Sequence, residues 1–498
     1  MTRGVIYNQG MKTQSAILGV LLIGTACHRD VVAPPVGTRL VFSVQPAATT
    51  VGQALSPALQ VEIQDGSGTR VPTARDAVTI ALGANPGGAI LSGTTTVNAV
   101  AGIATFSGLS LDRGGLGYTL VATAPGLTTA TSAPFVMTSP GPRIAAGNDY
   151  TCALTSSGAA YCWGANGQGQ LGDGTKTDHA RPAPVSGNLR FLTLSAGAEH
   201  VCALTAAGTS YCWGSNGSGE LGTGSASGPE SCPVIASPPA ACSTVPVAAA
   251  AGLTFVTVSA GGAHTCGLTA GGAAYCWGDN LAGQLGDGTQ NPRLNPTPVS
   301  GGLSFASISA GALIHTCGLT TAGAAFCWGS DQYGQLGDGD SATFHPSPRA
   351  VGGGYTFQAI VAGASHTCGV TLTGAAYCWG YNNFGQLGDT TTTDANRSSP
   401  FPVQGGVSFT SVIPGSYHTC GLTGAGVAYC WGNNFDGELG DGHTDEAHSP
   451  VLVQSGFASY VSLSLGIDHT CAMSDDDVAF CWGVSAAGRD SLPVRVVP

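Results

Sequence analysis

The sequence predicts an all-β protein in which an Ig-like β-sandwich precedes a seven-bladed β-propeller. The tripeptide Cys-Trp-Gly occurs seven times and contains all 7 tryptophans of the 498-residue chain. The copies lie about 51 residues apart, a period typical of solenoids, arrays and propellers. Glycine is abundant, at 77 residues, and only 9% of residues are charged. This composition suits short strands joined by tight turns.

Composition also excludes several classes of protein. The formal net charge is −12 and no basic cluster is present, whereas nucleic-acid binding requires Lys and Arg to replace counterions at phosphates. We therefore expect no nucleic-acid partner. The chain is too long for a single hydrophobic core, so several domains or an array are expected. The low charge argues against a helical protein, and the apolar content argues against disorder.

Residues 1–27 have the pattern of an export signal. Lys12 precedes a short apolar run that ends at Cys27. A basic start, a short apolar stretch and small residues before the cleavage site are typical of secretory signals. The ending Gly-Thr-Ala-Cys resembles a bacterial lipobox, although Gly24 stands where Leu is usual, and it implies a lipid on Cys27 and a place in the cell envelope. The alternative is an ordinary signal, and Met1 and Met11 are both candidate starts.

A linker over 28–38 leads into a predicted β-sandwich over 39–140. Short β-type runs alternate with turn residues, at about seven strands per 100 residues, as in sandwiches. The expected strands are Leu40–Val44, Leu59–Ile63, Val78–Leu82, Gly102–Phe106, Tyr118–Ala122 and Ala133–Met137. The residues from Val51 to Pro57, with Val61 and Asp65, resemble bacterial Ig-like domains. That resemblance implies a spacer or, alternatively, an adhesive domain.

Each Cys-Trp-Gly belongs to a predicted hairpin whose loop fixes the pairing. In the first copy, Gly158 is the third residue of a three-residue loop, where a type I turn with a bulge needs a positive φ. Thr155 then pairs with Ala159, and Cys152 faces Cys162 at a non-hydrogen-bonded pair. Cα atoms at such a pair are about 4.5 Å apart, which a disulfide accepts.

All cysteines except Cys27 form pairs ten positions apart, so we expect eight disulfides. This cysteine content indicates an oxidising compartment. Zinc sites, which prefer shorter cysteine spacings, and reduced thiols are the alternatives. The predicted pairs are Cys152–Cys162, Cys202–Cys212, Cys232–Cys242, Cys266–Cys276, Cys317–Cys327, Cys368–Cys378, Cys420–Cys430 and Cys471–Cys481.

Two further strands precede each hairpin in the predicted repeat. One ends in small residues, as in Phe305–Ala310, and before it lies a short Pro-Val segment such as Pro298-Val299. Four strands are the content of one propeller blade. The first repeat starts at Arg143 without a Pro-Val segment, and the chain ends with one over 492–497. We therefore predict that this C-terminal strand completes the first sheet and closes a ring over 143–498 without a free edge.

The loop after most Trp-Gly pairs has the form x-N-x-x-G-Q-L-G-D-G-T, as in 166–175 and 280–289. Together with His-Thr-Cys and the glycine turn, these residues resemble the regulator-of-chromosome-condensation repeat family. The resemblance implies a seven-bladed β-propeller over 143–498. Eukaryotic members act on small GTPases, and some secreted members bind and inhibit enzymes such as β-lactamases, so the resemblance also implies protein binding.

No catalytic chemistry is evident in the repeats. Six histidines share one repeat position and Tyr150 takes the seventh; we expect hydrogen-bonded structural side chains, with a metal or proton site as the alternative. The aspartates of the Gly-Asp-Gly turns lack calcium-loop spacing and are expected to cap turns. No nucleophile, zincin or phosphate-loop motif occurs, so no enzyme activity, metal or cofactor is expected. The histidines are His200, His264, His315, His366, His418 and His469.

Aromatic residues mark the loops of repeats four to six. Tyr333, Phe384 and Phe435, with Tyr381 nearby, lie in the loop after Trp-Gly, which has no aromatic residue in the first three repeats. Aromatic side chains commonly anchor protein interfaces. We predict that these residues form a partner-binding arc on one face, with packing between blades as the alternative. An insertion over 226–251 is expected to project from the ring.

The predicted function is that of a monomeric, cell-surface-anchored protein-binding propeller that acts as a scaffold or an inhibitor. Its partner would be an unknown protein or surface glycan. The alternatives are a periplasmic or extracellular propeller enzyme acting on polysaccharide or peptide, and guanine-nucleotide exchange on a GTPase. The export signal argues against exchange, because GTPases are cytosolic.

Overall fold

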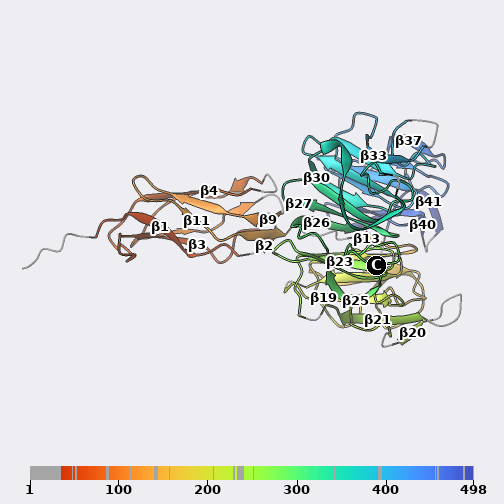
Figure 1. The fold of residues 1–498 in the computed structure, drawn as a ribbon, viewed down its shortest axis with the longest axis horizontal. Helices are drawn as coiled ribbons and strands as arrows, with labels where there is room; N and C mark the ends of the chain where they lie inside the picture. Colours follow the sequence, from red (N-terminus) through yellow and green to blue (C-terminus); the bar gives the residue numbers. More distant parts are fainter. Residues whose placement is uncertain are drawn as a thin grey trace, which may run out of the picture.

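The computed structural model describes residues 35–496 apart from short gaps. The gaps are 48, 51–52, 86–88, 112–114, 139–143, 156, 206, 228–229, 233–239, 251, 341, 391–394, 455, 457–458 and 486–487. The predicted signal and Cys27 lie outside the described residues. Figure 1 shows the N-terminal strands, in red to orange, grouped apart from the repeated sheets. In the described part of the chain, no helix is long and apolar enough to cross a membrane.

The N-terminal strands form small sheets around one core. They are β1 (Arg39–Val44), β2 (Thr49–Thr50), β3 (Leu59–Gln64), β4 (Ala77–Leu82), β5 (Leu91–Ser92), β6 (Thr96–Asn98), β7 (Ile103–Phe106), β8 (Ser110–Leu111), β9 (Gly115–Tyr118), β10 (Leu120–Thr123), β11 (Ala130–Thr131) and β12 (Phe135–Thr138). Their sheet orders are β1-β3-β7, β11-β10-β4-β6, β2-β12-β9 and β5-β8. Leu59, Val61 and Ile63 alternate into the core and are fully buried.

One predicted strand of this domain is divided in the structure. Tyr118–Ala122 was expected as a single strand, but β9 ends at Tyr118 and β10 begins at Leu120. The chain changes sheets between them, because β9 pairs with β12 whereas β10 pairs with β4. Thr119 fixes this corner, since its Oγ1 accepts a hydrogen bond of 2.8 Å from the Ala84 amide.

Seven repeated sheets follow within the described residues, and we call them blades 1 to 7. Blade 1 contains β13 (Ile144–Ala146), β14 (Tyr150–Leu154), β15 (Ala160–Gly164) and β16 (His179–Pro184); blade 2 contains β17 (Thr193–Ala196), β18 (His200–Leu204), β19 (Ser210–Ser215), β20 (Glu230–Cys232) and β21 (Ala240–Ala248); blade 3 contains β22 (Thr257–Ala260), β23 (His264–Leu268), β24 (Ala274–Gly278) and β25 (Arg293–Pro298). Blade 4 contains β26 (Phe305–Ala310), β27 (His315–Thr320), β28 (Ala325–Ser330) and β29 (Phe344–Ala350), followed by the 3-10 helix η1 (Gly352–Gly354). Blade 5 contains β30 (Phe357–Ala362), β31 (His366–Thr371), β32 (Ala376–Gly380) and β33 (Arg397–Pro402); blade 6 contains β34 (Ser411–Pro414), β35 (His418–Leu422), β36 (Ala428–Gly432) and β37 (Ala447–Leu452); blade 7 contains β38 (Tyr460–Leu465), β39 (His469–Ser474), β40 (Ala479–Ser485) and β41 (Gly488–Arg495).

The central hairpin of each blade has the register that its loop predicts. In blade 1, the Thr155 amide donates to the Ala159 carbonyl, Gly158 has φ +79°, and Cys152 lies opposite Cys162. The structure joins this pair in a disulfide with a Cα–Cα distance of 4.1 Å. The other six hairpins and the insertion carry the remaining predicted pairs. The cysteines therefore stabilise each hairpin individually and do not join blades.

The predicted role of the C-terminal strand is wrong. It was expected to complete blade 1, but β41 pairs with β40 as the outer strand of blade 7, with Val494 opposite Cys481. The outer strand of blade 1 is its own β16, in which Ala183 lies opposite Cys162. The proline-containing segment thus folds back on the hairpin that precedes it. Each blade is built from one continuous stretch of chain.

Side-chain contacts, rather than a shared strand, join blade 7 to blade 1. The Ala146 amide donates to Ser464 Oγ at 2.8 Å. The same bond joins Ala260 to Ser195, Ala310 to Ser259, and Ala362 to Ser309 between other neighbouring blades. Ile144 also packs with Met473 in one buried cluster. The junction between the first and last blades therefore uses contacts found at other interfaces of the ring.

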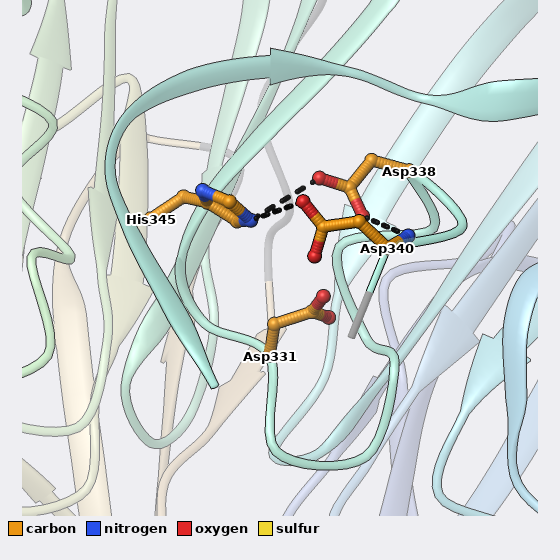
Figure 2. A group of neighbouring side chains, drawn as sticks. All are labelled: Asp331, Asp338, Asp340 and His345. Atoms are coloured by element: carbon orange, nitrogen blue, oxygen red, sulfur yellow. Dashed lines mark hydrogen bonds and ion pairs between the residues drawn. The ribbon is translucent and has the colours of Figure 1, made fainter. Parts of the chain in front are cut away.

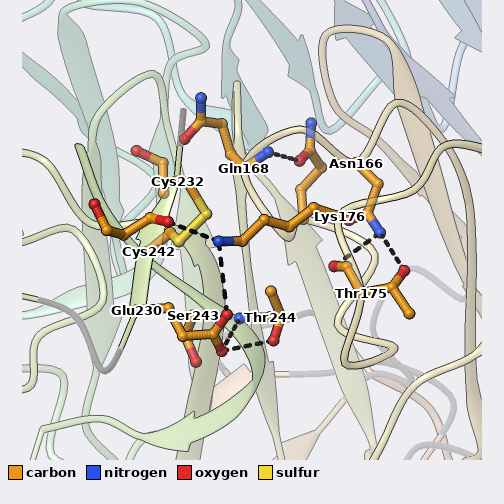
Figure 3. Close-up of a disulfide and its surroundings, with 12 residues drawn as sticks. Asn166, Gln168, Thr175, Lys176, Glu230, Cys232, Cys242, Ser243 and Thr244 are labelled. Atoms are coloured by element: carbon orange, nitrogen blue, oxygen red, sulfur yellow. Dashed lines mark hydrogen bonds and ion pairs between the residues drawn. A yellow bond between two sulfur atoms is a disulfide. The ribbon is translucent and has the colours of Figure 1, made fainter. Parts of the chain in front are cut away.

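The insertion adds a fifth strand to blade 2. β20 pairs with the lengthened outer strand β21, and both Cys232 and Cys242 are fully buried. Figure 3 shows Lys176, from the loop of blade 1, reaching this segment. Its Nζ donates to the Ser231 carbonyl at 2.7 Å and lies 3.9 Å from Glu230. The described part of the insertion thus contacts both blades instead of only projecting from the ring.

Candidate functional site

The four predicted binding residues lie together in the structure. Tyr333, from the loop of blade 4, contacts Tyr381 of blade 5 with ring centroids 4.9 Å apart. Tyr381 contacts Phe384 at 6.4 Å, and Phe384 contacts Phe435 of blade 6 at 6.1 Å. These are distances at which aromatic pairs attract one another. The rings therefore form a continuous row across three blades.

A fifth ring, Tyr417, completes this row. It lies 5.5 Å from Phe384, and its side chain is 41% exposed. Tyr417 was not predicted from the sequence, because it precedes His418 in a different loop of the repeat. We call Tyr333, Tyr381, Phe384, Tyr417 and Phe435 the aromatic arc. Phe435 is the most exposed ring, at 58%, so the arc combines packing between blades with an accessible apolar surface.

Acidic side chains continue from the arc toward blades 7, 1 and 2. Asp436 follows Phe435 directly, and Asp468, Asp149 and Glu199 take the repeat position that Tyr417 has in blade 6. Burial raises the pKa of the Asp468 carboxyl, and its neighbours Asp436 and Asp149 raise it further. Burial and Asp149 likewise raise the pKa of Glu199. The face therefore carries an aromatic part and an adjoining acidic part.

A small cavity lies where blade 7 meets blade 1. Its volume is about 230 Å³, and its lining includes Asp149, Trp163, Asp178, His469 and Val484. Blade 7 lacks the loop that follows the tryptophan in blades 1 to 6, which has the form Asn/Asp-x-x-Gly-Gln/Glu-Leu-Gly. At other interfaces this loop covers the tryptophan of the next blade. The cavity thus corresponds to the missing loop and opens beside the acidic part of the face.

The repeated histidines form hydrogen bonds between blades. His264 Nε2 lies 2.9 Å from Thr316 Oγ1, and the Thr316 hydroxyl donates to the Gln284 carbonyl at 2.8 Å. Trp328 Nε1 donates to the same carbonyl at 3.0 Å. Because the Thr316 hydroxyl donates its one proton to the Gln284 carbonyl, it can only accept from His264. His264 Nε2 therefore carries a hydrogen and donates it to Thr316 Oγ1. The equivalent pairs are His200–Thr265, His315–Thr367, His366–Thr419, His418–Thr470 and His469–Thr151.

Blade 1 uses a different pair at this position. The Tyr150 hydroxyl lies 2.7 Å from the His200 carbonyl and 3.0 Å from the Gly197 carbonyl. Val201 stands in blade 2 where the other blades have threonine. Because tyrosine reaches the backbone directly, no threonine hydroxyl is needed there. These side chains are structural links between blades, as the sequence analysis expected.

Comparison with known families decides the classification of the repeats. The model of the RCC1-like domain matches residues 110–407 and 255–493. The chain belongs to the RCC1-like domain family. It is 34% identical over 219 residues to "Ultraviolet-B receptor UVR8" of Arabidopsis thaliana, across 43% of this chain and 49% of UVR8. It is 32% identical over 194 residues to "Probable E3 ubiquitin-protein ligase HERC4" of Homo sapiens, across 37% of this chain and 18% of HERC4.

Solved structures of RCC1-like proteins share the fold. Human WBSCR16 superposes with a TM-score of 0.60 at 22% identity, over 71% of this chain and 92% of its own. Prp20p of Saccharomyces cerevisiae superposes with a TM-score of 0.59 at 21% identity, over 69% and 87%. At these identities the similarity concerns the fold alone. The matches span about half of UVR8 and less than a fifth of HERC4, so the activities of those proteins are not transferred with the repeats.

Proposed function

We propose that this RCC1-like protein is an exported binding module whose aromatic arc anchors a partner protein. The observation that carries the proposal is the unbroken row of five rings, two of them exposed by 41% and 58%. Clustered aromatic side chains are common energetic centres of protein interfaces. Because the arc adjoins acidic side chains, the partner is expected to present apolar side chains next to Lys or Arg.

The relatives support a binding role over catalysis. The family is known for protein interaction and exchange-factor roles. The structure of Prp20p is described with its binding to Gsp1p and histones, and another yeast structure shows RCC1 bound to Kap60. Gsp1p, histones and Kap60 are partners of the yeast proteins. What we carry to this chain is the general use of the propeller as a protein-binding surface.

Replacing two exposed rings of the arc tests this function. We expect the double variant Tyr417→Ala/Phe435→Ala to weaken partner binding at least about 30-fold, the effect of losing about 2 kcal/mol at an interface centre. Partners are captured from cell-surface extracts on the immobilised protein and identified, and their affinities are then measured by titration calorimetry. The melting temperature should change little, because both rings lie at the surface and neither belongs to a buried core.

Leu372→Ala is the matched control. Leu372 is 67% exposed in the hairpin turn between β31 and β32, at the opposite end of these strands from Tyr381. Its replacement should leave binding unchanged. A partner that binds the arc variant as tightly as the wild type would refute the arc as the binding surface.

We further propose that the N-terminal part exports and displays the propeller. The paired cysteines suit an oxidising compartment, the lipobox-like ending at Cys27 would supply an anchor, and the N-terminal β-domain would act as an Ig-like spacer. We expect Cys27→Ala to move the protein from the membrane fraction to the soluble exported fraction, as followed by immunoblot after fractionation. Membrane association that persists in this variant would exclude a lipid on Cys27 as the anchor.

A further inference from the structure

Asparagine side chains organise the loops that follow the third strands. In blade 3, Asn280 Oδ1 accepts a hydrogen bond from the Leu285 amide at 3.0 Å. Its Nδ2 donates to Asp287 Oδ1 at 3.2 Å and to the carbonyls of Thr289 and Asn291, each at 3.0 Å. Asn166 and Asn434 make the corresponding bonds in blades 1 and 6. The amide NH₂ therefore points into a group of oxygen acceptors.

Blade 4 has a carboxylate at this position. Asp331 Oδ1 accepts from the Leu336 amide at 2.8 Å, as the asparagine oxygen does in the other loops. Asp331 Oδ2 therefore takes the place of the NH₂ group, but an ionised carboxylate cannot donate a hydrogen bond. Asp331 is only 5% exposed, and its Oδ2 is buried without a hydrogen-bond partner. A buried, unpaired acceptor is costly unless a positively charged species binds it.

Further potential metal ligands surround Asp331. Figure 2 shows Asp338, Asp340 and His345 around its carboxylate, and one ligand atom of each of the four lies within 4.8 Å of the others. His345 Nε2 lies 3.4 Å from Asp338 Oδ2 and 3.0 Å from Asp340 Oδ2. Arg349 lies 3.3 and 3.4 Å from the same two oxygens. Arg349 thus faces Asp338 and Asp340, whereas Asp331 Oδ2 has no hydrogen-bond partner.

We propose that Asp331, Asp338, Asp340 and His345 bind a divalent metal ion. Carboxylate oxygens suit Ca²⁺ and Mn²⁺, whereas the imidazole favours Zn²⁺ or Mn²⁺. The side chains of Asp340 and His345 are 35% and 17% exposed, which gives an ion access from solvent. Blades 1 and 3 do not repeat this set, because they have asparagine in place of Asp331 and threonine in place of Asp340.

A bound proton is the competing explanation for the buried carboxylate. Burial, together with the negative charges of Asp338 and Asp340, raises the pKa of Asp331 to about 6. A protonated Asp331 would donate a hydrogen bond much as asparagine does. A metal ion and a proton can be distinguished because only the ion makes stability depend on added cation.

The test measures the melting temperature of the intact disulfide-bonded chain after EDTA treatment and after addition of CaCl₂, MnCl₂ or ZnCl₂. We expect at least one cation to raise the wild-type melting temperature by several degrees. Asp331→Asn should remove this response and should melt in EDTA at or above the wild-type temperature, since it restores the side chain of the other loops. With His345→Gln, a Zn²⁺ or Mn²⁺ response should disappear, whereas a Ca²⁺ response carried by oxygen ligands should persist.

Asn280→Asp in blade 3 is the reciprocal control. It places a carboxylate beside Asp287, which already pairs with Arg293 at 2.7 Å, in a loop with Thr289 in place of the second aspartate. This variant should melt at a lower temperature and should gain no cation response. The proposal is overturned if none of the three cations stabilises the wild type, if Asp331→Asn responds as the wild type does, or if Asn280→Asp gains an equal response.

Discussion

Acidification is expected to unfold the propeller cooperatively, with uptake of several protons and a midpoint at about pH 5. The six repeated histidines are buried between blades, and burial lowers their pKa values. The pKa is about 4 for His200, His315 and His469, and about 3 for the other three. The Nδ1 atoms of His200, His264, His366 and His418 have no hydrogen-bond partner. A second ring proton would thus be unpaired there.

The direction of the effect follows from the lowered pKa values. Because the pKa of an unfolded histidine is about 6.5, the unfolded chain binds more protons than the folded chain between about pH 6.5 and pH 4. Stability is therefore complete above this window and falls as the pH decreases through it. Each histidine loses about 3 kcal/mol by pH 4, and six such losses exceed the usual stability of a domain. The raised pKa values of Glu199, Glu220 and Asp468 act in the opposite direction and offset a part of this loss.

Urea denaturation followed by tryptophan fluorescence from pH 8 to pH 4 measures this dependence. The double variant His264→Tyr/Thr316→Val copies the Tyr150 and Val201 pair of the first interface, so it should fold at pH 7.5 and take up about one proton fewer. A wild-type stability that is flat from pH 7 to pH 4.5 would contradict the buried, neutral histidines. An unchanged slope in the double variant would show that His264 does not contribute to the proton uptake.

The sequence predicted the features that local rules control. The three-residue loop ending at Gly158 specified the register of the hairpin and hence the pairing of Cys152 with Cys162. The partner of the proline-containing strands was not specified locally, because such a strand lies between two hairpins and has the right length to pair with either. Only the three-dimensional path of the loop shows that β41 returns to β40. The contact that closes the ring between blades 7 and 1 was therefore predicted at the C-terminal strand, whereas side chains such as Ser464 and Ile144 make it.

The candidate sites likewise contain some residues that the sequence reveals and others that only the fold reveals. The rings of Tyr333, Phe384 and Phe435 were visible as departures from the repeat in one loop, but Tyr417 belongs to another loop, and only the fold brings the two loops together. Asp331 was overlooked because a change from asparagine to aspartate is chemically slight in a sequence. Its significance appears only when the asparagines of the other loops are seen to use their NH₂ groups as donors.

A glycine lies three or four residues before each repeated histidine and before Tyr150. We expect substitution of this glycine to destabilise the propeller more than substitution at other positions of the repeat. Seven glycines share this place, among them Gly147, Gly261 and Gly466. A Cβ atom on Gly261 would lie 2.4 Å from Cε1 of His264 and 2.6 Å from the Gly311 carbonyl oxygen of the next blade. The His264 ring is held by its bond to Thr316, and the carbonyl belongs to the backbone. Neither neighbour is free to move, so overpacking should be costly.

We expect Gly261→Ala to destabilise the protein by at least about 3 kcal/mol, the upper part of the range for overpacked cores, as measured by chemical denaturation. Gly271→Ala, in the hairpin loop of the same blade, is the matched control. A Cβ there meets nothing within 4 Å, and Ala207 and Ala322 occupy the same loop position in blades 2 and 4. This control should change stability by less than about 1 kcal/mol, in the stabilising direction that replacing a compatible glycine takes.

The histidine ring and the carbonyl can be separated as causes of this effect. In a background of His264→Ala the ring contact is absent, so Gly261→Ala should cost less than in the wild type if the ring dominates, and the same amount if the carbonyl dominates. Either outcome is consistent with Gly261 being the residue that allows neighbouring blades to approach closely. Equal stabilities for Gly261→Ala and Gly271→Ala would contradict this close approach, because the interface would then have room for a methyl group beside the His264 ring.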